Sequence, residues 1–187
     1  MHVECHFWAP RDGLKDRADR DRAPYDLWWA QKLLTTPAGR SVDYSFVATR
    51  IGELMQRCPQ MQAIAFDRWR IDELKRELAH LGCDAPLVEW GQGFKDMAPA
   101  LDAFEVEALE GRLRHGAHPI LTWNVANAVI TTDAAGNRKL DKSKTTGRID
   151  GAQALAMAMG IRARGAVGEM PAGPSPWEDP GFRLEAV

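Results

Sequence analysis

Two helical patterns that alternate with two short apolar runs constrain the fold of this chain more than any other feature. Apolar residues recur at helical spacing over 43–58 and again over 71–81, whereas the apolar runs at 61–66 and 87–90 have the length of buried strands. A crossover helix between two consecutive strands normally joins parallel partners. The order helix, strand, helix, strand therefore predicts a parallel α/β core with both helices packed on the sheet.

The segments on either side of this core are less regular. Residues 11–40 mix charges of both signs with prolines and a short aromatic cluster, which predicts a loop and one short helix. A third helix is expected over 99–114, where apolar residues fall on one side. Residues 120–123 are apolar and resemble a strand. These expectations add helices and strands around the parallel core.

The last third of the chain contains a hairpin pattern and an alanine-rich helix. Residues 128–132 read as a strand, and the turn residues before Leu140 predict that this strand belongs to a β-hairpin. A final helix is expected to begin near Asp150, with small residues that allow close packing on a sheet. We expect 161–187 to form a tail rich in proline and glycine.

Length and composition limit the classes of protein to consider. At 187 residues the chain has the size of one domain and is too short for a nuclease together with a full ATPase. It contains neither a phosphate-binding P-loop motif nor an apolar stretch approaching the roughly 20 residues of a membrane span. Without an export signal at its start, we expect a cytoplasmic location. Because the formal net charge is −2, any DNA contact must be local.

Two aspartates lie where a fixed carboxylate can meet a cation. Asp67 follows the first predicted strand, and Asp150 opens the alanine-rich helix. Phosphodiester hydrolysis by Mg²⁺ or Mn²⁺ needs such oxygen ligands, because these hard cations prefer carboxylates. By position alone, Asp67 also fits an ordinary turn residue and Asp150 an acidic residue that complements the helix dipole. The pattern makes the two acids candidate catalytic and metal-binding residues.

Other polar and aromatic residues have structural interpretations beside functional ones. Four cations near the hairpin suit phosphate contacts or a solvated loop, and they are Lys139, Lys142, Lys144 and Arg148. Glu89 ends a strand, and His115 and His118 flank a turn, where structural roles are more common than catalytic ones. The tryptophans that we expect in or beside the core are Trp69, Trp90 and Trp123.

The succession of motifs over residues 40–160 resembles the nuclease half of phage large terminases. Its most specific parts are the strand that ends in Asp67, the HG, HP, W and N residues within 115–124, and the RIDG sequence at 148–151. The resemblance implies a ribonuclease H-like fold, related to Holliday-junction resolvases, and cleavage of double-stranded DNA with two Mg²⁺ or Mn²⁺ ions. It also implies that Asp67 matches the second acid of the family and Asp150 its late acid.

The chain departs from the family pattern at its start. In the family, the first catalytic aspartate lies on an opening strand upstream of a segment like HFWAPRDG, which here occupies 6–13. We therefore expect an α/β fold with a ribonuclease H-like mixed sheet flanked by helices, lacking the opening strand or strands. In this interpretation 1–160 form a partial terminase nuclease domain and 161–187 the tail.

The leading functional hypothesis is a metal-dependent endonuclease domain that cleaves double-stranded DNA during genome packaging. The partners that the resemblance implies are the terminase ATPase domain, the small terminase subunit and the portal, in the cytoplasm of a bacterial host and without a membrane. An alternative hypothesis is a catalytically inactive prophage remnant that retains a DNA- or portal-binding surface. A resolvase-like nuclease of another pathway is a further alternative, with less reason to carry the motif at 115–124.

Overall fold

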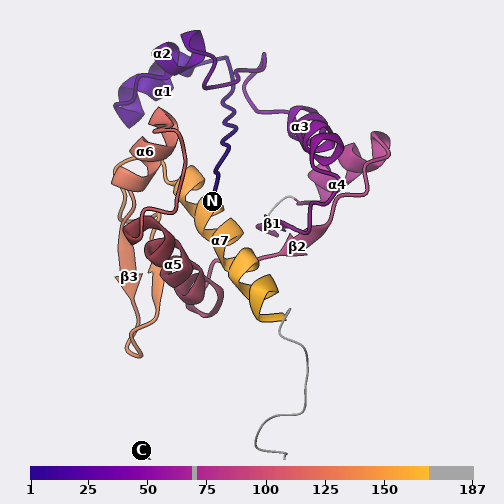
Figure 1. The fold of residues 1–187 in the computed structure, drawn as a ribbon. Coiled ribbons are helices and arrows are strands. Elements are labelled where there is room, and N and C mark those ends of the chain that lie inside the picture. Colours follow the sequence, from indigo (N-terminus) through magenta and orange to yellow (C-terminus); the bar gives the residue numbers. More distant parts are fainter. Residues whose placement is uncertain (69–70, 169–187) are drawn as a thin grey trace, which may run out of the picture.

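The structure, a computed structural model, describes residues 1–68 and 71–168. Seven helices and four short strands make up this part of the chain (Figure 1). In chain order they are α1 Leu14–Asp21, α2 Tyr25–Ala30, α3 Tyr44–Arg57, β1 Ile64–Phe66, α4 Ile71–His80, β2 Leu87–Glu89, α5 Phe94–Leu109, α6 Pro119–Ala126, β3 Ile130–Thr132, β4 Arg138–Leu140 and α7 Asp150–Gly168.

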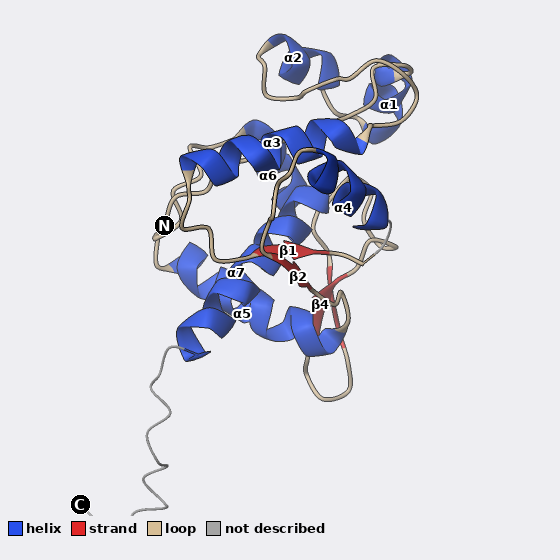
Figure 2. Ribbon diagram, turned by 90° about the vertical axis from the view of Figure 1, so that its right-hand side faces the viewer, coloured by secondary structure: helices blue, strands red, loops and turns tan. Residues whose placement is uncertain are grey.

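The predicted parallel unit is confirmed. β1 and β2 pair in parallel, with Ile64 opposite Leu87 and Phe66 opposite Glu89. α3 and α4 pack against each other beside this pair (Figure 2), and Ala48, Leu74 and Leu78 form a buried cluster that also contacts Leu87. The side chain of Asp43 accepts a hydrogen bond from the backbone N–H of Ser45 (2.8 Å), which caps the start of α3.

The long helix α7 packs along α5, and small residues bring the two helices close together. Ala100 on α5 and Ala156 on α7 are fully buried, and the ring of Trp90 fills the space beside Gly160. A Cβ atom at Gly160 would lie 2.7 Å from the Cβ of Ala100, inside normal contact distance. The absence of a side chain at Gly160 is therefore a condition of the packing between α5 and α7.

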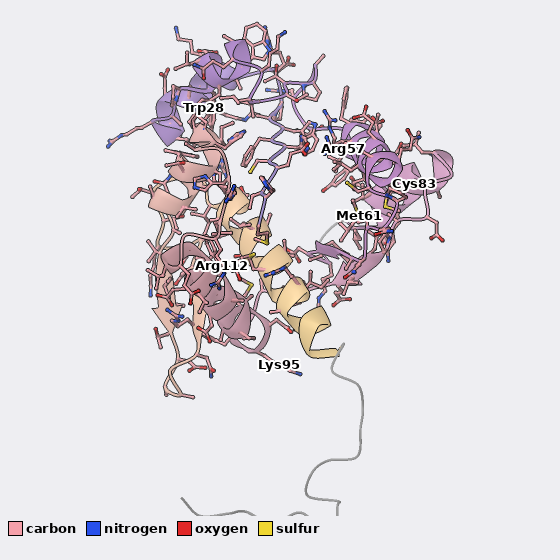
Figure 3. The ribbon with its side chains drawn as sticks, in the orientation of Figure 1. Trp28, Arg57, Met61, Cys83, Lys95 and Arg112 are labelled. Carbon is pink, nitrogen blue, oxygen red and sulfur yellow. The ribbon has the colours of Figure 1, made fainter. Side chains whose placement is uncertain are left out.

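The N-terminal segment runs in extended conformation before α1. Its residues form isolated parallel bridges, His2 with Arg114 and Trp8 with Thr35. Beyond it, α1 and α2 enclose a second core in which Tyr25 and Trp28 contact Trp123 of α6, and Figure 3 labels Trp28 within this upper cluster. The aromatic residues of α2 thus dock onto the body through α6.

Several expectations about the elements were wrong. Residues 120–123 belong to helix α6, and 11–40 contain two helices where one was expected. α6 begins with Pro119 and packs on α7 and on the core around Tyr25. Its exposed side also carries apolar residues, Val125 and Ala126, so its helical period is hidden. α5 begins at Phe94 and contains Pro99, which we had placed at the helix start.

The expected sheet and tail also differ from the structure. In the described part of the chain the strands form two separate two-stranded sheets, β1 with β2 and the antiparallel hairpin β3 with β4, in place of one mixed sheet. The hairpin itself and the start of α7 at Asp150 are as predicted. α7 continues past Gly160 to Gly168, because the first proline of the expected tail is Pro171, beyond the end of the helix. Residues 169–187 of the expected tail lie outside the described residues.

Candidate functional site

Asp67 directly follows β1, at the carboxyl end of the parallel pair. Its Oδ2 accepts a hydrogen bond from the side-chain amide of Gln92 (2.6 Å), which lies between β2 and α5. The neighbouring Arg68 lies 3.1 Å from the carboxylate of Glu89, the last residue of β2. Polar side chains from two adjacent strand ends thus gather at one edge, the usual location of sites in parallel sheets.

Asp150 is the first residue of α7, where its carboxylate complements the positive end of the helix dipole. The side chain is 68% exposed, and its Oδ1 accepts a hydrogen bond from the ammonium group of Lys142 (2.8 Å). Because α7 packs against β1, the two aspartates belong to elements in contact. That the two carboxylates meet at one metal site stays a prediction.

Buried contacts from α6 hold the start of α7 in place. Asn124 is 3% exposed, its amide donates to the carbonyl of Ile120 (2.8 Å), and its Oδ1 accepts from the backbone N–H of Gly151 (2.8 Å). A Cβ at Gly151 would meet the ring of Phe7 at 2.7 Å, and a Cβ at Gly147 would clash with Asn127. The glycines on both sides of Asp150 are needed because α6 and the N-terminal segment approach so closely.

Asn124 is a residue whose role the sequence analysis missed. The only signal was its membership of the motif at 115–124. With the 120–123 segment taken as a strand, nothing indicated that the amide would reach the first turn of a helix 27 positions away. In the structure, Asn124 holds the backbone next to Asp150 through its hydrogen bond with Gly151.

Asp21, the last residue of α1, holds the segment before Asp150 through Arg148. Its carboxylate accepts hydrogen bonds from Arg20 (2.8 Å), the hydroxyl of Tyr25 (2.8 Å) and Arg148 (3.2 Å). These donors, the bond from Arg20 first, lower the pKa of Asp21 to about 2. Burial and the bond to Asp21 raise the pKa of Tyr25. The interaction ties the RIDG sequence to α1 and α2.

We expect the Asp21 contacts to make stability depend on acid pH. Because the folded-state pKa lies below the ordinary value of 3.8, the stabilising contribution is present above that value and is lost as the pH falls through it towards about 2. Urea unfolding at stepped pH should show a steeper loss for the wild type than for Asp21→Asn. The control is Asp26→Asn, at an exposed position of α2. Identical pH profiles for wild type and Asp21→Asn would contradict this role.

The four cations of the basic run all have partners within the chain. Lys139 lies 4.8 Å from the centre of the Phe94 ring, Lys142 pairs with Asp150, and Lys144 lies 3.5 Å from Asp141. Arg148 pairs with Asp21. The side chains of Lys142, Lys144 and Arg148 are 51%, 59% and 53% exposed, so they remain accessible to a ligand. A phosphate would have to compete with these carboxylates or share their cations.

The histidines and tryptophans of the motifs pack against other side chains. The ring of His118 stacks obliquely on Phe7 with centroids 5.3 Å apart, and burial lowers the pKa of His118. Trp90 is 2% exposed, and Trp123 contacts the rings of Tyr25 and Trp28, as expected for residues in or beside the core. Trp69 lies outside the described residues.

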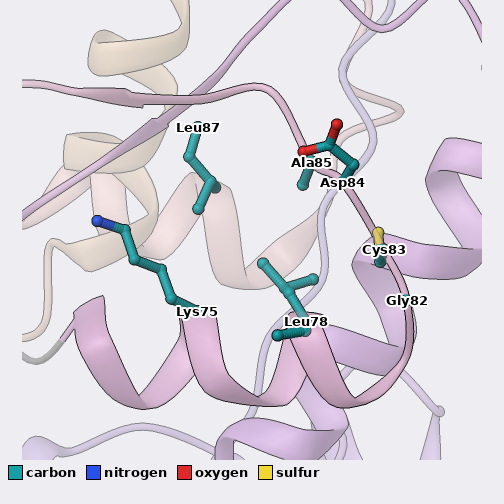
Figure 4. Close-up of a pocket in the computed structure, with 8 residues that line it drawn as sticks. Lys75, Leu78, Gly82, Cys83, Asp84, Ala85 and Leu87 are labelled. Atoms are coloured by element: carbon teal, nitrogen blue, oxygen red, sulfur yellow. The ribbon is translucent and has the colours of Figure 1, made fainter.

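The described residues provide the right ligand chemistry for a hard cation but an incomplete set. Asp67 and Asp150 supply carboxylate oxygens, the donors that Mg²⁺ and Mn²⁺ prefer. Within 1–68 and 71–168, however, no three His, Cys, Asp or Glu side chains are arranged to hold a metal ion. The pocket between α4 and β2 that Figure 4 shows does not supply the missing metal ligands. Most of its lining is apolar, and its charged residues are Lys75 and Asp84.

Comparisons with known proteins identify relatives over most of the chain. The sequence pattern of the terminase large subunit endonuclease domain matches residues 6–166. The terminase large subunit of Enterobacteria phage HK97 is 53% identical over 163 residues, covering 87% of this chain and 32% of the relative. Protein YmfN of Escherichia coli K12 is 28% identical over 164 residues, covering 84% of this chain and 35% of the relative.

A solved structure agrees in fold. The crystal structure of the HK97 large terminase matches with a TM-score of 0.80 and 52% identity, over 86% of this chain and 33% of that chain. The chain thus spans about a third of the length of the relatives it matches. Within the described residues, none of the helices combines the length and apolar character required to cross a membrane.

Proposed function

The chain belongs to the terminase large subunit endonuclease-domain family, and we propose that it is the metal-dependent nuclease region of a phage DNA-packaging enzyme. Its substrate would be double-stranded DNA and its cofactor Mg²⁺ or Mn²⁺. The observation that carries the proposal is the placement of two aspartates on contacting elements, Asp67 at the carboxyl end of β1 and Asp150 at the amino end of α7. The ribonuclease H-like character of the fold is part of this proposal.

Each polar residue of the site has a task under this proposal. Asp67 and Asp150 would hold the cation, and a bound divalent ion would supply Lewis-acid activation of water and stabilisation of the leaving oxygen. Gln92 fixes one oxygen of Asp67, and Asn124 fixes the backbone beside Asp150. Lys142 now neutralises Asp150 and is free to turn towards a phosphate once a cation takes its place.

The basic run would bind the DNA backbone. Lys139, Lys144 and Arg148 lie in the hairpin and the segment that leads to Asp150, so phosphate contacts there would guide a strand towards the acids. Such contacts position DNA without reading its sequence, and they weaken as salt rises. In a complete packaging enzyme the partners would be the terminase ATPase, the small subunit and the portal, within the cytoplasm of the bacterial host.

One observation favours a second candidate function. Because the described residues do not assemble three metal ligands, the chain by itself suits a catalytically inactive protein that retains a DNA- or portal-binding surface. This alternative predicts weak or no metal binding, since two carboxylates are too few ligands for two strongly hydrated cations.

Titration calorimetry with Mn²⁺ tests the proposed site. We expect weak binding by the 187-residue chain that disappears in Asp67→Asn and in Asp150→Asn, because an amide keeps the shape of the side chain but loses its charge. Asp26→Asn is the matched control, since Asp26 also lies in the first turn of a helix. Mn²⁺ binding that survives both substitutions would refute the assignment, and no Mn²⁺ binding by the wild type would support the inactive alternative.

A further inference from the structure

Residues 90–92, which connect β2 to α5, hold Asp67 in two ways. The backbone N–H of Trp90 donates to the carbonyl of Phe66 (2.9 Å), the residue before Asp67. The side-chain amide of Gln92 donates to Oδ2 of Asp67 (2.6 Å). The first bond fixes the peptide group that leads into Asp67, and the second fixes the rotation of its carboxylate. The direction in which this carboxylate points therefore depends on where residues 90–92 are held.

The side chain of Trp90 anchors these residues on α7. Its ring fills the space beside Gly160 and is almost completely buried. Arg164 follows one helical turn later, and its guanidinium group lies 3.9 Å from the centre of the same ring. A guanidinium group is attracted to the face of an indole, and its planar shape allows it to stack there. α7 thus contacts the indole at two successive turns, and Figure 2 shows α7 beside β1 and β2.

Asp96, in the first turn of α5, completes the anchor. Its Oδ1 accepts a hydrogen bond from Arg164 (2.8 Å), and its Oδ2 lies so close to Gly91 that a Cβ atom at Gly91 would overlap with it. Because both charged side chains are partly exposed, solvent screens the ion pair, and its main effect is on geometry. Arg164 therefore contacts the Trp90 ring and also the carboxylate that packs on Gly91, the two residues that precede Gln92.

We propose that Arg164 is a positioning residue of the candidate metal site and orients the Asp67 carboxylate through residues 90–92. It does so without touching that carboxylate, by its contacts with Trp90 and Asp96. The inference rests on the proposed function, in which Asp67 is a metal ligand. Groups that orient a metal ligand commonly lower the metal affinity when they are removed.

Arg162 on the same helix provides a matched comparison. It pairs with Glu107 of α5 (3.5 Å), and its side chain is about as exposed as that of Arg164. Both arginines thus connect α7 to α5 through an ion pair, and Arg164 differs in its stack on Trp90. Loss of either ion pair should affect stability to a similar extent, whereas the orientation of Asp67 should depend on Arg164 alone.

Arg164→Gln and Arg162→Gln, made in the 187-residue chain, test the proposal. In two-dimensional proton–nitrogen NMR spectra, the side-chain amide signals of Gln92, assigned by their loss in Gln92→Glu, report its contact with Asp67. We expect Arg164→Gln to shift these signals towards those of glutamines in water, and Arg162→Gln to leave them unchanged. Arg164→Lys should shift them less, because lysine keeps the charge opposite Asp96 but lacks the planar group that stacks on the ring.

Titration of the same variants with Mn²⁺ measures the effect on the metal site. Arg164→Gln should weaken Mn²⁺ binding by about threefold to tenfold, less than the roughly 10–100-fold typical of removing a group that contacts a ligand directly. Arg162→Gln should leave the affinity unchanged. Urea unfolding should give similar midpoints for the two variants, so that lower stability does not account for the difference.

The two measurements separate this inference from the proposed function. Unchanged Gln92 signals in Arg164→Gln, or equal changes in Arg164→Gln and Arg162→Gln, would overturn the inference whether or not the chain binds a metal. Shifted signals with an unchanged Mn²⁺ affinity would also overturn it if Asp67→Asn abolishes binding. Mn²⁺ binding that persists in Asp67→Asn, or that is absent in the wild type, would refute the metal site itself and with it the role of Arg164 there.

Discussion

Replacing Gly160 by alanine is expected to destabilise the protein by about 1–3 kcal/mol, the usual range for overpacking a close-packed core. The new methyl group would lie 2.7 Å from the Cβ of Ala100 and would also meet the buried ring of Trp90. Neither neighbour can move away easily, because Trp90 is 2% exposed and Ala100 is fully buried within the contact between α5 and α7. Urea unfolding at equilibrium measures the change.

Gly165→Ala provides a control in the same helix. Its Cβ would point into open space, so the substitution should stabilise α7 by roughly 0.5–1 kcal/mol through the lower conformational entropy of the unfolded chain. Opposite signs for the two substitutions would separate packing from helix propensity. Equal or greater stability of Gly160→Ala would show that α5 and α7 are not in the close contact described above.

The second large effect concerns DNA cleavage. We expect the 187-residue chain to cut plasmid DNA weakly or not at all with Mn²⁺, because its described acids form an incomplete ligand set. Fusion of an upstream strand that carries an aspartate should raise cleavage. In that fusion, Asp67→Asn or Asp150→Asn should reduce the rate by orders of magnitude, as loss of a metal ligand does.

The cleavage comparison needs matched ionic strength, because contacts from the basic run to phosphates weaken as salt rises. Asp26→Asn again serves as the control, and we expect it to retain activity. Strong cutting by the unmodified chain that persists in both Asn variants would defeat the assignment of the acids. Cutting by the unmodified chain that either Asn variant abolishes would show that the acids are right and that the chain is active without the added strand.

The parallel core was predictable because its signals are local. The helical spacing over 43–58 and 71–81 and the short apolar runs between and after them lie within single elements, and β1, β2, α3 and α4 appear where expected. α6 was missed because its exposed positions include the apolar residues Val125 and Ala126, so no polar face marks the helix. The division into two small sheets depends on which strands meet in space, which periodicity does not encode.

The positions of the two candidate acids in the fold were predictable, and their surroundings were not. Asp67 and Asp150 could be placed from the strand and helix that they adjoin. Some contacts around them come from distant segments: Gln92 lies 25 positions from Asp67, and Asp21 lies 127 positions from Arg148, in the segment before Asp150. The first contact follows from the pairing of β1 with β2, and the second from the position of α1 beside the segment before α7, which a single sequence does not reveal.

A crystal structure of the chain soaked in Mn²⁺, with the ions located by their anomalous scattering, tests the central claim most directly. The account predicts that the carboxylates of Asp67 and Asp150 share or bridge bound Mn²⁺, with about 4 Å between the two ions if both are present. Carboxylates more than about 10 Å apart, with no ion in contact with either, would contradict the two-metal site, since that separation exceeds the span of such an ion pair.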